Sequence, residues 1–367
     1  MKKSKEAMRD FQESLGMFDL FKGIGVIGVI IFHSISSFSF SQSVDGASIY
    51  TKLGLFVFMV LGSALMPAFF IVSGYGFRPQ KARLIQKKVK SILVPYIVMA
   101  VVTVILHFVL HYGAFHYLKG TIKESIKVIV GFLLALSSNM EINGINFYNC
   151  GIGWYLISLL GVIILLNAFC KWANEKAWIF VLIATIIGIA TGLNQIFLFC
   201  IPQIMTGIFF FYEGYFIKEH KLLYRRWNWK WSVLFCLCIL LTAIGVVYAG
   251  QMDNIAEGRW NFLLLSVILD GVMAFFGLYI LLLFNKYNNH GIVFLRRIGN
   301  KSLILFCVHS IEMKAVPWYI VTDRWTGNPF VGCCLLVLAR CLAIFVGYKT
   351  FLFIHKYIWR KLKKLKK

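Results

Sequence analysis

Charged side chains are scarce in this sequence. They make up 14% of the 367 residues, whereas hydrophobic residues make up 59%. Together with a mean hydropathy of +0.76, this scarcity excludes a soluble globular protein, because a soluble core could not bury so much apolar surface. Acidic residues are the rarer charged group, with 15 Asp and Glu against 38 Lys and Arg. The composition predicts an all-α polytopic membrane protein.

Several signatures of other protein classes are also missing. The nine cysteines show no CxxC pattern and no metal-ligand spacing, so no metal site is expected. The sequence has no Walker motif, nucleophile elbow or dinucleotide fingerprint. A net charge of +23 could suggest nucleic-acid binding. The basic residues nevertheless fall in short clusters between apolar segments, without a soluble basic module, so no nucleic-acid partner is expected.

Apolar segments dominate what is present. Each candidate span is close to the roughly 20 residues that a bilayer requires. There are about ten: 18–40, 53–77, 91–111, 151–170, 177–193, 197–216, 231–249, 261–284, 302–320 and 330–354. A further stretch, 123–137, is short and carries Lys123, Glu124 and Lys127.

The distribution of Lys and Arg predicts the topology. The segments 76–90, 217–230 and 285–301 are strongly basic, which is typical of cytoplasmic loops. An even number of spans must separate the first two segments, and this holds only if 123–137 does not cross the membrane. We therefore expect 123–137 to form an interfacial or re-entrant helix, and both termini to be cytoplasmic.

This topology divides the chain into three parts. Residues 1–17 are polar and lack a signal-peptide cleavage pattern, so they are expected to form a cytoplasmic N-terminal segment. Residues 18–354 form the transmembrane domain. Residues 355–367 form a basic cytoplasmic tail, which suits anionic inner-leaflet lipid.

Ionisable residues in the first span are the strongest functional signal. The span contains Asp19, Lys22 and His33, and such residues are costly in hydrocarbon unless they serve a function. Lys22 and His33 are separated by about three helical turns, or about 16 Å, and therefore share one helix face. His33 suits a general base and Lys22 suits an anionic group. The alternative is a snorkelling lysine and a histidine bonded to a neighbouring helix.

A second group of candidates, for cofactor binding, begins at the inner end of the second span. Ser73 and Tyr75 lie there in a segment rich in small residues, which suits either close helix packing or the wall of a cavity. The basic run that contains Lys87, Lys88 and Lys90 could hold the phosphates of a cytoplasmic cofactor. These lysines could equally act only as topology signals.

Further ionisable and aromatic residues lie in later spans. Asp270, Arg340 and Lys314 are expected at a membrane depth similar to that of His33. Burying these ionisable groups costs less free energy if all four face one water-filled cavity. A structural ion pair between Asp270 and Arg340 is the alternative. Trp154 and Tyr155 suit either an aromatic belt or stacking against a sugar. The candidate substrate-binding residues are Trp154, Tyr155, His309, Asp270, Arg340 and Lys314.

These residues, in this order, resemble acyltransferase family 3, a family of integral membrane O-acyltransferases. The resemblance covers residues 18–354. It is carried by Asp19 and Lys22-x10-His33, by Phe69-Phe-Ile-Val-Ser-Gly-Tyr75, by Lys87-x-x-Lys90 before Pro95-Tyr96, by Trp154-Tyr-Leu156 and by Leu305-Phe-Cys-Val-His309.

The resemblance implies transfer of an acyl group, usually acetyl, from acyl-CoA to a hydroxyl of a cell-envelope glycan or its precursor in a bacterial plasma membrane. It implies that His33 deprotonates the hydroxyl, while Lys22, next to Asp19, orients the donor. Lysines replace the arginines of the family's basic step, which removes a bidentate phosphate contact. A stand-alone form is expected, because no esterase-like domain follows the last span.

Two other functions remain open from the sequence. A transporter or flippase for a lipid-linked sugar would also use ionisable residues inside the membrane. Such proteins often contain inverted repeats with paired broken helices, and no such pairing is evident here. A sensor or scaffold that has kept the fold without the activity is the third hypothesis.

Overall fold

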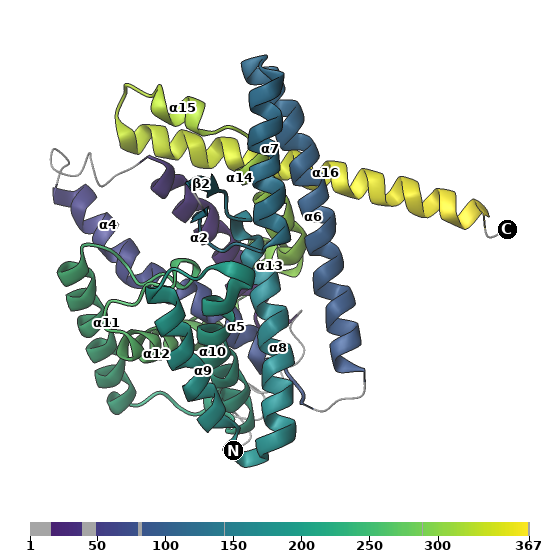
Figure 1. Ribbon diagram of the computed structural model, residues 1–367. Coiled ribbons are helices and arrows are strands. Elements are labelled where there is room, and N and C mark those ends of the chain that lie inside the picture. The colour runs from purple at the N-terminus through teal and green to yellow at the C-terminus, as the bar shows by residue number, and fades with distance from the viewer. Residues whose placement is uncertain (1–15, 39–48, 80–82, 143, 288, 366–367) are drawn as a thin grey trace.

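The computed structural model describes the chain except for residues 1–15, 39–48, 80–82, 143, 288 and 366–367 (Figure 1). The predicted cytoplasmic segment 1–17 therefore lies almost entirely outside the described residues. The described part is almost wholly helical, with one small hairpin. The prediction of an all-α polytopic membrane protein is confirmed.

The α-helices account for most of the chain. They are α2 (Asp19–Ser37), α4 (Ile49–Gly62), α5 (Leu65–Tyr75), α6 (Leu84–Phe115), α7 (Leu118–Leu133), α8 (Trp154–Ala173), α9 (Ala177–Leu193), α10 (Ile201–Glu219), α11 (Trp229–Ala249), α12 (Leu264–Phe284), α13 (His290–Asn300), α14 (Ser302–Ala315), α15 (Tyr319–Asp323) and α16 (Pro329–Leu365). Short 3₁₀ turns lie between some of them: η1 (Gly151–Gly153), η2 (Asn174–Lys176), η3 (Leu198–Cys200), η4 (Leu222–Tyr224) and η5 (Ile255–Glu257).

Within the described residues, seven helical segments are long and apolar enough to cross a membrane. They correspond to seven of the predicted spans. The other three predicted spans, 177–193, 197–216 and 302–320, correspond to α9, α10 and α14. The number of spans and the cytoplasmic position of both termini stay predictions.

Two predicted spans differ in detail from the helices that form. The span 53–77 is interrupted at Ser63 and Ala64, where α4 ends and α5 begins. The span 302–320 ends early, because the backbone becomes extended at Val316, directly before a proline that cannot continue the helix. Both interruptions lie beside the cavities described below.

Most of the stretch 123–137 belongs to α7, which ends at Leu133 and packs alongside α6 (Figure 1). Its interfacial or re-entrant position stays a prediction. The Tyr96 hydroxyl of α6 donates to the Phe132 carbonyl of α7 at 2.6 Å, and His107 pairs with Ser125 at 3.1 Å. The chain then returns through β1 (Met140–Ile142) and β2 (Ile145–Phe147), an antiparallel pair, and reaches α8 through η1. This segment leads the chain from α7 to the start of α8.

The C-terminal helix α16 contacts α14 and α2 with its first part. Its later part extends away from the other helices (Figure 1). Residues 351–357 are exposed there.

Glycines bring the central helices into close contact. A Cβ atom on Gly74 of α5 would overlap the carbonyl oxygen of Phe211 in α10, and one on Gly214 of α10 would overlap that of Ile71. Gly23 of α2 and Gly299 of α13 meet in the same way, against backbone carbonyls of the opposite helix. Since lipid provides no hydrophobic drive between helices, such close packing is what holds them together.

Replacing Gly74 with alanine should lower the stability of the folded protein by about 1–3 kcal/mol, because the added methyl group forces α5 and α10 apart. Thermal unfolding of the full chain in detergent would measure the effect. Gly277→Ala is the matched control, since no described heavy atom lies within 4 Å of its Cβ position in α12. Equal unfolding temperatures for the two variants would contradict the role of the α5–α10 contact.

Candidate active site

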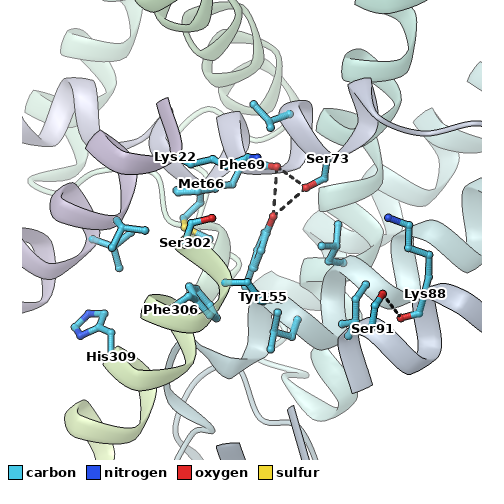
Figure 2. Close-up of a pocket in the computed structure, with 17 residues that line it drawn as sticks. Lys22, Met66, Phe69, Ser73, Lys88, Ser91, Tyr155, Ser302, Phe306 and His309 are labelled. Atoms are coloured by element: carbon cyan, nitrogen blue, oxygen red, sulfur yellow. Dashed lines mark hydrogen bonds between the residues drawn. The ribbon is translucent and has the colours of Figure 1, made fainter. Parts of the chain in front are cut away.

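Five helices, α2, α5, α6, α8 and α14, surround a cavity of about 270 Å³. We call it the inner cavity, because its basic residues lie toward the predicted cytoplasmic side. Its wall is mostly apolar, and its polar residues include Lys22, Ser73, Lys88, Tyr155, Ser302 and His309. Tyr155 lies between Lys22 and Lys88 in Figure 2. Five residues singled out from the sequence therefore reach one cavity from five helices.

Tyr155 is fixed by α5. Its hydroxyl lies 3.2 Å from the Ser73 hydroxyl and donates to the Phe69 carbonyl at 3.3 Å (Figure 2). The Ser73 hydroxyl also donates to the Phe69 carbonyl, at 2.9 Å. Three polar groups thus satisfy one another within an apolar wall, which holds the ring of Tyr155 in one orientation.

Lys22 is held by Asp19 one helical turn away. Their Nζ and Oδ1 atoms lie 3.3 Å apart, and Asp19 is almost fully buried. Asn300 of α13 donates to the other oxygen of Asp19 at 3.5 Å. The carboxylate therefore positions the lysine at the cavity and does not itself line it.

The three lysines of the basic run have different positions. All three are exposed on α6, but only Lys88 contributes to the inner cavity. Lys87 and Lys90 lie outside the cavity wall. Tyr75 also lies outside it, where it packs edge-on against Phe18 and donates a long hydrogen bond of 3.5 Å to Tyr224. Roles for these residues in cofactor binding stay predictions.

A second cavity, of about 370 Å³, begins on the opposite side of the same helices. We call it the outer cavity, because Ser137, Ser138, Asn149 and residues 252–257 line it, and the predicted topology places these segments on the outer side. Its polar wall includes His33, Asn149, Trp154, Asp253, Glu257 and Lys314. Burial raises the pKa of the Asp253 carboxyl, although a hydrogen bond from the Asn261 amide opposes the shift.

The two cavities share a wall. Val29, Met66 and Phe306 line both of them. On α2, Lys22, Val26, Val29 and His33 follow one another at helical spacing, so one stripe of that helix runs from the inner cavity to the outer one. Consecutive residues of α8 also divide between the cavities, with Trp154 in the outer and Tyr155 in the inner.

His309 lies on the inner side of this wall and belongs to a buried hydrogen-bond network. Its Nδ1 lies 2.6 Å from Glu312 Oε1, and the Trp318 indole donates to Glu312 Oε2 at 2.6 Å. Its ring centroid is 5.7 Å from that of His33. Two histidines from α14 and α2 thus face each other where the cavities meet.

Arg340 supports this network from α16. Its guanidinium carbon lies 5.7 Å from the centre of the Trp318 ring, and its Nη2 donates to the Ser37 hydroxyl at 3.1 Å. Arg340 is 2% exposed and lines neither cavity. Its position therefore fits the support of Trp318 and α2, and its predicted contact with substrate stays a prediction.

Asp270 is also buried, on α12, and lines neither cavity. No ion pair joins it to Arg340 among the described residues. We expected four residues to face one water-filled cavity: Asp270, Arg340, Lys314 and His33. Only His33 and Lys314 share a cavity, the outer one.

Sequence reasoning gave no role to several residues of this site. Glu312 was recognisable in principle, because a carboxylate three residues after His309 lies on the same helix face. Asp253 and Glu257 belong to an outer loop, where an acidic residue carries no signal by itself. No sequence signal marked Phe306 as part of the site either, since one aromatic residue in an apolar span resembles any other.

The arrangement provides two compartments with different chemistry. The inner one combines an apolar wall with two lysines, and the outer one combines an indole ring with carboxylates, an amide and a lysine. Imidazoles lie where the compartments meet. A reaction between a molecule from each side could be served by proton transfer at that point. No group of three or more potential metal ligands occurs among the described residues.

Comparison with known proteins identifies the family. The family model described as an acyltransferase domain matches residues 16–365, nearly the whole chain. No curated protein and no solved structure matches. The chain therefore belongs to acyltransferase family 3, and it is a multi-pass membrane acyltransferase that acts on a hydroxyl group.

Proposed function

We propose that this acyltransferase moves an acyl group, acetyl by preference, from cytoplasmic acyl-CoA to a hydroxyl of a cell-envelope glycan or glycan precursor in a bacterial plasma membrane. The observation that carries the proposal is the pair of cavities that meet at Val29, Met66 and Phe306. A donor and an acceptor could approach from opposite sides of the membrane and react at this wall.

The inner cavity suits the acyl-CoA donor. Coenzyme A is polyanionic, and Lys22 and Lys88 are the two lysines of this cavity wall. The remaining wall is largely apolar, which suits the pantetheine arm and the thioester. Lys87 and Lys90 lie on the same exposed helix end, where they would attract phosphates that stay outside the cavity.

The outer cavity suits a sugar hydroxyl. Sugars combine an apolar ring face with many hydrogen-bonding groups. Trp154 offers a flat apolar surface, while Asn149, Asp253 and Glu257 offer hydrogen-bond partners along the same wall. His33 lies in this cavity and belongs to the helix stripe that leads to Lys22.

The chemistry follows from these positions. His33 takes the proton of the acceptor hydroxyl while the oxygen attacks the thioester carbon, and the carbon–sulfur bond then breaks. Asp19 holds Lys22 in place for the donor. The products are an acyl ester on the outer side and coenzyme A on the inner side.

The first test concerns His33. Replacing it with glutamine should lower acyl transfer at least about 100-fold, because the hydroxyl loses its proton acceptor. Mass spectrometry of envelope glycans, looking for an added acetyl group, would measure this in cells that contain the full chain. His107→Gln is the matched control, since His107 is another helix histidine that lines neither cavity and contacts Ser125.

Unchanged glycan acetylation in the His33→Gln variant, with normal membrane insertion, would contradict the role of His33. The absence of acetylated glycan even with the unmodified protein would contradict the proposed reaction itself. A transporter of a lipid-linked sugar would then be the better hypothesis.

The second test concerns the donor. Lys88→Gln should raise the KM for acetyl-CoA about tenfold with little change in kcat, because one charged contact worth about 1.4 kcal/mol is lost from binding. Initial rates in membrane vesicles with labelled acetyl-CoA would separate KM from kcat. Lys230→Gln is the control, as it removes a positive charge from another predicted cytoplasmic segment. An equal KM in both variants would exclude Lys88 from the donor site.

A further inference from the structure

His309 has the geometry of an oriented acid–base group. Its Nδ1 is bonded to Glu312 at 2.6 Å, so a carboxylate fixes the ring and the proton on that nitrogen. Its Nε2 is buried and has no hydrogen-bond partner among the described residues. Because His309 lines the inner cavity, this unpartnered nitrogen is placed where a bound molecule could meet it.

The carboxylate partner is itself fixed. Trp318 donates to the second oxygen of Glu312 at 2.6 Å, and Arg340 lies over the Trp318 ring at 5.7 Å. Both oxygens of Glu312 are therefore engaged, which holds the carboxylate in one orientation. A histidine that served only to join helices would not need a network leaving Nε2 free.

The two histidines belong to different compartments. His309 lines the inner cavity and His33 lines the outer one, with ring centroids 5.7 Å apart. Phe306, one turn before His309 on α14, lines both cavities. His309 is thus on the donor side of the wall and His33 on the acceptor side.

The charged groups around His309 come from each helix packed against it. On its own helix they are Glu312 and Lys314. Across the cavity, α2 contributes Lys22 and α6 contributes Lys88. His33 of α2 lies in the neighbouring outer cavity, and Arg340 of α16, which lines neither cavity, lies over the Trp318 ring. Glu312 is the acidic group in contact with the ring.

We propose that His309 is the general acid of the transfer. His33 accepts a proton on the acceptor side of the wall, and His309 donates a proton on the donor side. This inference rests on the proposed function. The hydroxyl oxygen forms a bond to the thioester carbon and gives its proton to His33. The carbon–sulfur bond breaks with its electron pair on sulfur, and the protonated His309 gives the Nε2 proton to that sulfur.

The cycle closes when the proton on His33 returns to His309, so the reaction consumes and releases no net proton. A general acid matters at this position because a thiolate formed in an apolar cavity lacks the water that would stabilise its charge. Lys22 and Lys88 attract the phosphates of the donor, whereas His309 acts on its sulfur.

Replacement of the donor sulfur with selenium tests this assignment. A selenolate is much less basic than a thiolate and leaves without a proton. His309→Gln should therefore lower the rate about 100-fold with acetyl-CoA, and by less than about tenfold with its selenium analogue. The rate of the His33→Gln variant should fall by the same factor with both donors, because the acceptor hydroxyl still needs a base.

The measurement uses membrane vesicles that contain the full chain and endogenous envelope glycans, with each donor labelled in its acetyl group. Cys307→Ala, on the same helix and outside both cavity walls, should behave as the unmodified protein. Glu312→Gln supplies a second variant in case His309→Gln does not fold. Its rate with acetyl-CoA should fall by a smaller factor than that of His309→Gln. With the selenium analogue its rate should again be closer to that of the unmodified protein.

The outcomes separate the two proposals. If the unmodified protein transfers no acetyl group from acetyl-CoA to glycan, the proposed function fails. If the unmodified protein does transfer acetyl, the rates of the variants decide the general-acid role. That role is overturned if the rate of His309→Gln or Glu312→Gln falls by the same factor with both donors, or does not fall at all, and the proposed function then still stands.

Discussion

The cost of placing an ionisable group in hydrocarbon governs this structure. The first span carries Asp19, Lys22 and His33, and none of them faces lipid alone. Asp19 is paired with Lys22, Lys22 lines the inner cavity, and His33 lines the outer one. The helices α5, α8 and α14 pack around these groups and contribute to both cavities.

Interruptions in the helices make the interior possible. The second span stops at Ser63, so α4 and α5 contribute to different parts of the cavities, and the 3₁₀ turn η1 starts α8 where the cavities meet. The early end of α14 lets Trp318 turn back to Glu312. Regular spans of uniform length would place polar side chains against lipid instead.

The charges of the site have separate tasks. Lysines at the inner cavity suit an anionic donor. Two residues of this cavity are each bonded to a carboxylate: Lys22 to Asp19, and His309 to Glu312. Arg340 packs over the Trp318 ring, and Trp318 in turn donates a hydrogen bond to Glu312. The chain belongs to a family of membrane acyltransferases, and the polar groups in the walls of its two cavities are few.

The sequence by itself determined the class of protein, the helical segments and the spacing of Lys22 and His33 on one face of α2, because hydropathy and helical periodicity are local properties. It also indicated most of the polar residues that line the inner cavity. Only the tertiary structure decided that Lys22 and His33 serve different cavities, that Lys88 differs from Lys87 and Lys90, and that Asp270 lies apart. Which helices become neighbours depends on packing between apolar faces of similar composition, and no local pattern specifies that choice.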